Sequence, residues 1–260
     1  MKPGHYLVPF LIIITCSSCS RYYYKPNAVN TPLFTEGGQA HLNVAASFGG
    51  VSDEYDGNTS FVDVQGSVSP VNHLGIIANY STYSYRADEP DEANGNVDGK
   101  AHILEAGVGG YYAKGKKFKL VVDGYVGYGG GNITSDVDMK VKRFFVQPGI
   151  GVHSPWFDAA FNLRISNVRY TDFNAKGHTS DYLQQQNLIT SDGRRIDDKS
   201  YTFAEPSFTI RGGYKFAKVQ LQMVLAQDIS NARWNYNAAR FSAGFYFSLE
   251  DVLEMGRDKK

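Results

Sequence analysis

The sequence predicts an all-β protein, an antiparallel up-and-down transmembrane β-barrel of about ten strands. Three observations lead to this prediction. Segments of about ten residues alternate apolar with small or polar side chains, their connections alternate between short and long, and charges of both signs recur inside the segments. A period of two residues is typical of strands with two different environments, and transmembrane barrels have short turns at one end and long loops at the other.

Composition excludes several other classes of protein. The 260 residues include 18 Tyr, 16 Phe and 27 Gly but only 20% charged residues, which is too rich in aromatic rings for a disordered chain. The 26 basic residues balance 26 acidic ones, so we expect no nucleic-acid partner. After residue 20 no apolar run approaches the roughly 20 residues of a spanning helix, which excludes a polytopic helical membrane protein.

Residues 1–18 have the outline of a signal peptide: Lys2, a short apolar stretch and small residues at the exit. Both cysteines of the chain follow the apolar stretch, so the body has no internal disulfide. The stretch resembles a bacterial lipoprotein signal, in which a small residue precedes the cysteine that is acylated. Cys19, preceded by Ser18, fits best, although Cys16 stands where leucine is usual; Cys16 is the alternative acylation site. An ordinary cleaved signal stays open, and an uncleaved anchor is opposed by the short apolar part.

Residues 19–38 are expected to form a periplasmic linker. Pro26 and Pro32 argue against regular strand pairing, and the length suffices to join a lipid in the inner leaflet to a strand that enters from the periplasm. At the other end of the chain, residues 250–260 are expected to form a polar periplasmic tail. An assembly signal in this extension is the less favoured alternative.

The barrel is expected to cover residues 39–249. In one segment Phe161, Leu163 and Ile165 share a face, whereas Asn162 and Arg164 lie on the other. The ten expected segments are 39–48, 59–69, 74–86, 101–113, 118–130, 140–153, 157–171, 201–216, 218–227 and 238–249.

The connections between these segments give the expected orientation. Every odd-numbered connection is long (49–58, 87–100, 131–139, 172–200 and 228–237), and every even-numbered one is short (70–73, 114–117, 154–156 and the join near Ala217). Because short turns are periplasmic in transmembrane barrels, this phase predicts that both chain ends are periplasmic.

A soluble lipocalin-like barrel also alternates, but its outward face is polar. Here the polar face carries both signs of charge at comparable depth, which suits an interior where carboxylates and guanidinium groups pair. The expected interior charges are Asp63, Glu105, Asp123, Arg143, Arg164, Glu205, Arg211 and Arg240. Aromatic residues near the segment ends, among them Tyr83, Tyr111, Tyr112, Tyr125, Tyr128, Tyr170, Tyr201, Phe203 and Tyr214, predict girdles at the membrane interfaces.

Glycine-rich aromatic strands such as 106–112 and the terminal strand 240–247 resemble those of small bacterial outer-membrane barrels of the OmpX/opacity type. The resemblance covers residues 39–249 and concerns architecture rather than activity. It departs from the common form in having ten segments instead of eight and a polar extension after Phe247. The resemblance implies the outer membrane of a Gram-negative bacterium, with membrane lipid as the surrounding partner.

Candidate sites for chemistry are weak, and we expect no metal, no cofactor and no enzymatic activity. The acidic loop 88–98 has oxygen ligands for Ca²⁺ but lacks the usual spacing, so a solvated loop is the better interpretation. His178 and Asp181, with Asp172 and Asp192 nearby in sequence, form the closest approach to a hydrolase set, without a nucleophile motif.

The expected function is therefore a structural or surface-interaction role through the long loops. Gln184–Gln186 and the Arg194–Arg195 pair suit contact with polysaccharide, lipid head groups or protein, and the extracellular or envelope partner is not identified. A small pore, and a membrane subunit of an envelope secretion or assembly complex, are the alternatives. Interior charges of both signs disfavour the pore, because such charges pair and fill the lumen.

Overall fold

A computed structural model describes residues 23–48, 60–87, 97–234 and 236–252. Several expected features lie outside the described residues: the signal peptide with Cys16, the acylation site Cys19, all of loop 49–58, residues 88–96 of the acidic loop and residues 253–260.

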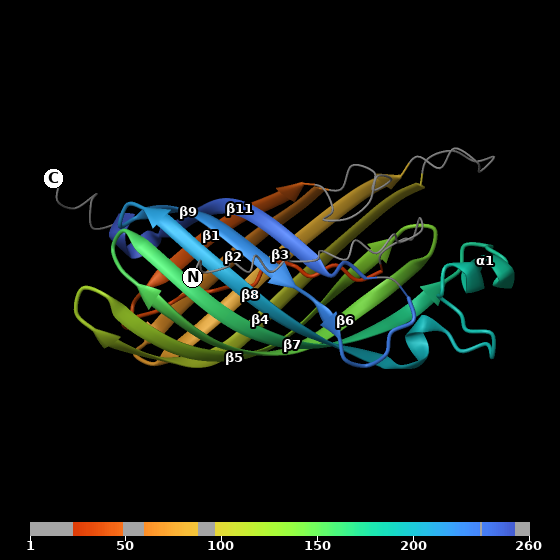
Figure 1. The fold of residues 1–260 in the computed structure, drawn as a ribbon, viewed down its shortest axis with the longest axis horizontal. Coiled ribbons are helices and arrows are strands. Elements are labelled where there is room, and N and C mark those ends of the chain that lie inside the picture. Colours follow the sequence, from red (N-terminus) through yellow and green to blue (C-terminus); the bar gives the residue numbers. More distant parts are fainter. Residues whose placement is uncertain (1–22, 49–59, 88–96, 235, 253–260) are drawn as a thin grey trace, which may run out of the picture.

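The described chain forms a closed, ten-stranded antiparallel β-barrel, which confirms the predicted fold class (Figure 1). Sequential strands are neighbours, and β1 closes the barrel by pairing with β11 as well as with β2. The barrel strands are β1 (Ala40–Phe48), β2 (Ser60–Val71), β3 (Leu74–Ala87), β4 (Val97–Gly115), β5 (Lys119–Thr134), β6 (Asp138–His153), β7 (Phe157–Asn174), β8 (Ser200–Gly213), β9 (Ala217–Leu225) and β11 (Ala239–Ser248). β10 (Gln227–Asp228) is a two-residue strand beside β8. In the ranges that the structure describes, no helix is long and apolar enough to cross a membrane.

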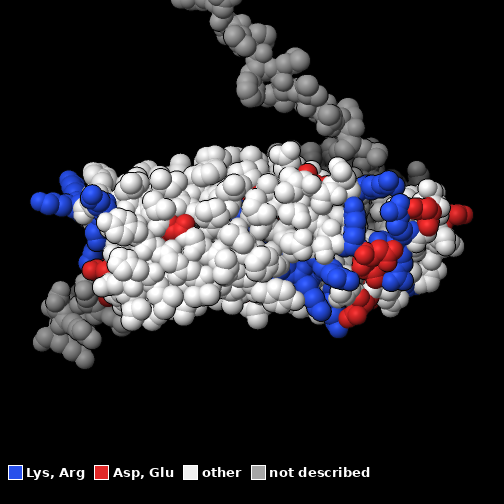
Figure 2. All heavy atoms as spheres, turned by 90° about the horizontal axis from the view of Figure 1, so that it is seen from below, with Lys and Arg blue, Asp and Glu red and all other residues white. Residues whose placement is uncertain are grey.

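The barrel is polar inside and apolar outside. In β9 the side chain of Leu221 is 59% exposed on the outer wall, whereas Gln220 and Gln222 are 1% and 3% exposed and point inward. The same alternation follows the other strands, and a band almost free of charge separates the two charged ends in Figure 2. A soluble barrel has the opposite arrangement, with its apolar face inside.

The connections lie at two distinct ends, which we call the long-loop end and the short-turn end. The helices α1 (Ser180–Gln185) and η1 (Ile196–Asp198) belong to the β7–β8 connection at the long-loop end (Figure 1). One expected long loop is wrong: β5 and β6 continue through most of residues 131–139 and leave only residues 135–137 between them. The strands extend because Ile133, Val137 and Met139 pack into an apolar cluster at this end.

The expected aromatic girdles are only partly present. Tyr112, Tyr128 and Tyr214 are exposed on the outer wall, as a girdle requires. The rings of several other residues turn inward and are at most 7% exposed, namely Tyr83, Tyr111, Tyr125, Tyr170, Tyr201 and Phe203. Proximity to a strand end does not fix the face of a side chain, and these rings fill the lumen instead.

Because the barrel is polar inside and apolar outside, a charged residue placed on the outer wall should change its stability. We expect the apolar wall to face lipid, so Leu221→Arg, at the middle of β9, should lower the free energy of unfolding in lipid vesicles by about 2–4 kcal/mol, because an arginine there would meet the bilayer midplane. Leu74→Arg, at the first residue of β3, should cost only about 0–1 kcal/mol. Urea titration of both variants measures the difference. In a soluble barrel the more exposed Leu221 would instead tolerate arginine at least as well as Leu74 does.

Candidate functional site: a lumen filled by the N-terminal segment

Residues 23–34, which we call the plug, run through the inside of the barrel, and every one of them is buried. At the long-loop end the hydroxyl of Tyr170 donates to the carbonyl of Tyr23 over 2.8 Å. At the short-turn end, just after the plug, Lys119 donates to Thr35 over 3.0 Å, and the N–H of Gly37 donates to the side chain of Asn72 over 2.6 Å. The plug therefore passes from one end of the lumen to the other before the chain turns into β1.

The expectation that residues 19–38 form a periplasmic linker is therefore revised for the plug. Pro26 and Pro32 do prevent strand pairing, but the segment is held inside the barrel by side chains of the wall. The described chain begins at the long-loop end with Tyr23 and ends at the short-turn end with Val252. The two ends of the described chain thus lie at opposite ends of the barrel.

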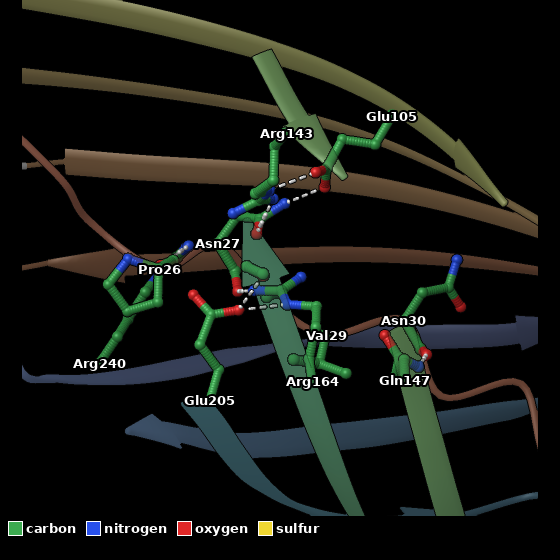
Figure 3. Close-up of polar contacts among 12 residues, drawn as sticks. Pro26, Asn27, Val29, Asn30, Glu105, Arg143, Gln147, Arg164, Glu205 and Arg240 are labelled. Carbon is green, nitrogen blue, oxygen red and sulfur yellow. Dashed lines mark hydrogen bonds and ion pairs between the residues drawn. The ribbon is translucent and has the colours of Figure 1, made fainter. Parts of the chain in front are cut away.

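Side chains of the wall bind six consecutive carbonyl groups of the plug, and Figure 3 includes the contacts made by Arg240, Arg164 and Gln147. The donors come from β2, β6, β7, β8, β9 and β11, so they surround the segment. The pairs are Arg240 to Pro26, Arg164 to Asn27, Gln65 to Ala28, Gln222 to Val29, Gln147 to Asn30 and Arg211 to Thr31, with distances of 2.7–3.2 Å. Buried carbonyl groups need such partners because no regular secondary structure satisfies them here.

The plug also takes part in the ion pairs of the lumen. Arg143 donates to Glu105 over 2.5 Å, and the amide of Asn27 bridges the two by accepting from Arg143 and donating to Glu105. Tyr24 donates from its hydroxyl to Glu205, which also pairs with Arg164. Pairing with additional hydrogen bonds is what makes a buried charge tolerable.

All eight side chains expected in the interior lie there, each at most 7% exposed. The structure brings six of them together as three ion pairs: Glu105 with Arg143, Glu205 with Arg164, and Asp63 with Arg240. Arg211 instead donates to Gln220 and to the plug, with Asp158 at 3.8 Å. Asp123 has no ion-pair partner among the side chains that the structure describes.

Sequence reasoning missed one further interior pair. Lys218 donates to Asp158 over 2.8 Å, and both side chains are at most 2% exposed. Lys218 is the second residue of β9 and lies next to a turn, where a lysine is expected to be solvated. The alternation of β9 was the available signal, because Lys218 shares the face of Gln220 and Gln222.

An apolar cluster closes the lumen at the long-loop end. The ring of Tyr24 stacks on Phe203 with ring centroids 4.0 Å apart, and Trp234 packs edge-on against Tyr201 at 4.9 Å. The longest connection folds onto this cluster through Leu183, Leu188 and Ile196, all buried. The plug is thereby anchored by stacked rings at its first residues.

A cationic pocket of about 330 Å³ lies between the β7–β8 and β9–β11 connections, over Tyr201 and Trp234. Its charged lining consists of four cations, Arg194, Arg195, Lys199 and Arg233, and one acid, Asp198. Asp192 pairs with Arg194, whose hydrogen bond lowers the pKa of Asp192 to about 2, and Asp197 pairs with Arg195. Asp192, Asp197 and Asp198 together offset three of the four cations, and within the described ranges Arg233 has no acidic partner, so the pocket keeps one unbalanced positive charge.

The weak hydrolase set does not assemble into a catalytic geometry. His178 stacks on the ring of Tyr182 at 4.2 Å, Asp172 pairs with Lys140, and Asp192 pairs with Arg194. No hydrogen bond between His178 and Asp181 is found in the described part of the chain. Among the described residues, no group of three or more His, Cys, Asp or Glu side chains could hold a metal ion.

The first residues of the expected C-terminal tail are attached to the barrel. Residues 249–252 form a helical turn, Glu250 accepts from the N–H of Ala40, and Asp251 pairs with Lys215 over 2.6 Å. Burial would raise the pKa of Glu250, but its hydrogen bond with His41 lowers the pKa to about 2. This part of the chain closes over the short-turn end.

No protein-family model matches the chain, and no curated protein matches it significantly.

The central ion pair gives a test of the filled lumen. Arg143→Met should lower the free energy of unfolding by about 3–5 kcal/mol, because it leaves the carboxylate of Glu105 buried without its counter-ion. Adding Glu105→Met should recover part of that loss, since the uncompensated charge is then removed. Denaturant unfolding in detergent micelles measures both variants. A double variant less stable than Arg143→Met would contradict this account of the pair.

Proposed function

We propose that the protein is an outer-membrane β-barrel lipoprotein that acts as a structural or surface-interaction protein through its long-loop end, without enzymatic activity. The observation that carries this proposal is the combination of an apolar outer wall with a polar lumen filled by the chain itself. An apolar wall suits lipid, and a filled lumen leaves the two ends as the surfaces that can act.

The proposed orientation follows from the connections. Long loops face the outside of the cell in transmembrane barrels, and short turns face the periplasm. The architecture is similar to that of the OmpX/opacity barrels, with ten strands in place of eight. In this orientation the short-turn end, with its helical turn 249–252, faces the periplasm.

The plug alters where the proposed lipid anchor attaches. Cys19 precedes Tyr23 by four residues, which span at most about 15 Å of extended chain. Tyr23 lies at the long-loop end, so an acyl group on Cys19 would enter the outer leaflet rather than the inner one. This replaces the inner-leaflet attachment that the sequence alone favoured.

The surface-interaction role is supported by the cationic pocket at the long-loop end. Its unbalanced positive charge and its volume of about 330 Å³ suit an anionic group of an extracellular or envelope partner. No specific observation favours the alternatives of a pore or of a subunit of a secretion complex. A pore would require displacement of the plug from the six side chains that bind its carbonyl groups.

The orientation can be tested with epitope insertions in intact cells. An epitope after Ser20 and one after Ser191, in the longest connection, should both bind antibody on unpermeabilised cells. An epitope in the short β4–β5 turn, after Lys116, should bind only after permeabilisation and serves as the matched control. Surface labelling of the Lys116 insertion, or protection of both others, would contradict the proposal. Incorporation of a labelled fatty acid that Cys19→Ser abolishes tests the acylation separately.

A further inference from the structure

A tier of cations lies on the outer wall of the barrel where the apolar band meets the long-loop end (Figure 2). Lys142 on β6 and Arg169 on β7 are directly opposite each other across the strands, and both side chains are exposed. Lys140 lies two residues nearer the long-loop end, on the same face as Lys142. Like charges directly opposite each other destabilise a pair of strands unless an anion lies between them.

The protein supplies too little negative charge to balance this tier. Asp172 pairs with Lys140 over 2.8 Å, and its pKa is lowered mainly by Lys140 and less by the charge of Lys142. Asp138, at the start of β6, pairs with Lys176 over 2.7 Å. Lys142 and Arg169 have no ion pair or hydrogen bond from their side chains to any described residue. Three cations, Lys140, Lys142 and Arg169, therefore face the single carboxylate of Asp172.

The wall beside these cations has the shape and polarity of a lipid-binding surface. Gly130 lies between Leu104 and Lys142 in the strand register, so no side chain separates the leucine from the cation. Towards the short-turn end, Tyr128 and Phe144 continue the apolar wall with 57% and 49% exposure, and Leu104 is 62% exposed. A charged group bound at Lys142 would thus have an apolar surface directly below it.

We propose that Lys142 and Arg169 bind the phosphate group of a membrane lipid whose acyl chains lie against Leu104, Tyr128 and Phe144. Two cations opposite each other can share the oxygens of one phosphate through charge-assisted hydrogen bonds. The continuous apolar wall favours a lipid headgroup over free phosphate, which would gain nothing from that wall. This inference rests on the proposed membrane-spanning barrel and adds the class of lipid that it binds at the long-loop end.

The test uses the full-length protein purified in a neutral detergent and titrated with dioleoyl phosphatidic acid. Native mass spectrometry should detect one saturable lipid adduct, and Lys142→Gln with Arg169→Gln should weaken it about tenfold or more. Dioleoyl phosphatidylcholine, which carries no net charge, should bind equally weakly to both proteins. Inorganic phosphate at the same concentrations should neither bind detectably nor compete.

The matched control is Lys116→Gln with Lys117→Gln, which removes two charges from the short-turn end. This control should bind phosphatidic acid as the unmodified chain does. Equal binding by the Lys142/Arg169 variant would overturn the inference, and competition by inorganic phosphate would overturn the choice of a lipid. Migration on SDS gels with and without heating shows whether each variant is still a closed barrel. An intact barrel with unchanged lipid binding refutes only the phosphate site, whereas loss of the barrel in the unmodified chain refutes the proposed function.

Discussion

The guanidinium groups buried in the lumen need more hydrogen-bond acceptors than the carboxylates of the wall supply. Each arginine carries five N–H donors, and a buried donor without a partner is costly. Arg143, Arg164, Arg211 and Arg240 each donate to the plug, three of them to backbone carbonyl groups. The plug in turn has no secondary structure of its own, so its carbonyl groups depend on those arginines and on three glutamines. The charged wall and the plug therefore stabilise each other.

The need to hold the plug inside the barrel also explains why glycine occurs at lumen-facing positions of the strands. A barrel of ten strands is slightly wider than the size that side chains alone fill, and here the lumen also has to accommodate a polypeptide segment. Glycine at lumen-facing positions provides the space: a Cβ at Gly151 would lie 2.7 Å from Leu33, and one at Gly75 would lie 3.2 Å from Phe34. The aromatic rings of the long-loop end close the lumen above the plug. On the outer surface, charged side chains lie mainly at the two ends of the barrel and in the tier beside Lys142.

The sequence predicted the barrel well because its alternation is local. The segment expected at 157–171, for example, is β7 over Phe157–Asn174. The interior position of the eight charges follows from the same alternation. Which charges pair could not be predicted, because partners such as Asp63 and Arg240 are 177 residues apart and meet only when the barrel closes.

The plug could not be predicted because its conformation is imposed by the wall and not by its own pattern. Its prolines exclude strand pairing, but the absence of pairing is common to a free linker and to a segment bound in the lumen. Pro26 and its partner Arg240 are 214 residues apart, so no local signal connects them. The glycines on the lumen face of β4–β6 were the available clue, since they leave a bore that side chains alone do not fill. The inward rings could not be predicted for a similar reason, because nearness to a strand end does not determine which face of the strand carries a side chain.

Hydrogen exchange measured by mass spectrometry on the barrel in lipid vesicles tests the central claim most directly. If the plug lies in the lumen, peptides that cover residues 23–34 should exchange as slowly as those from the middle of β7 and β9. The N–H of Val29, which donates to Gln222 over 2.8 Å, should be among the protected groups. Complete exchange of this segment within seconds, with the strands still protected, would show that the N-terminal segment is outside a closed barrel and would contradict the account.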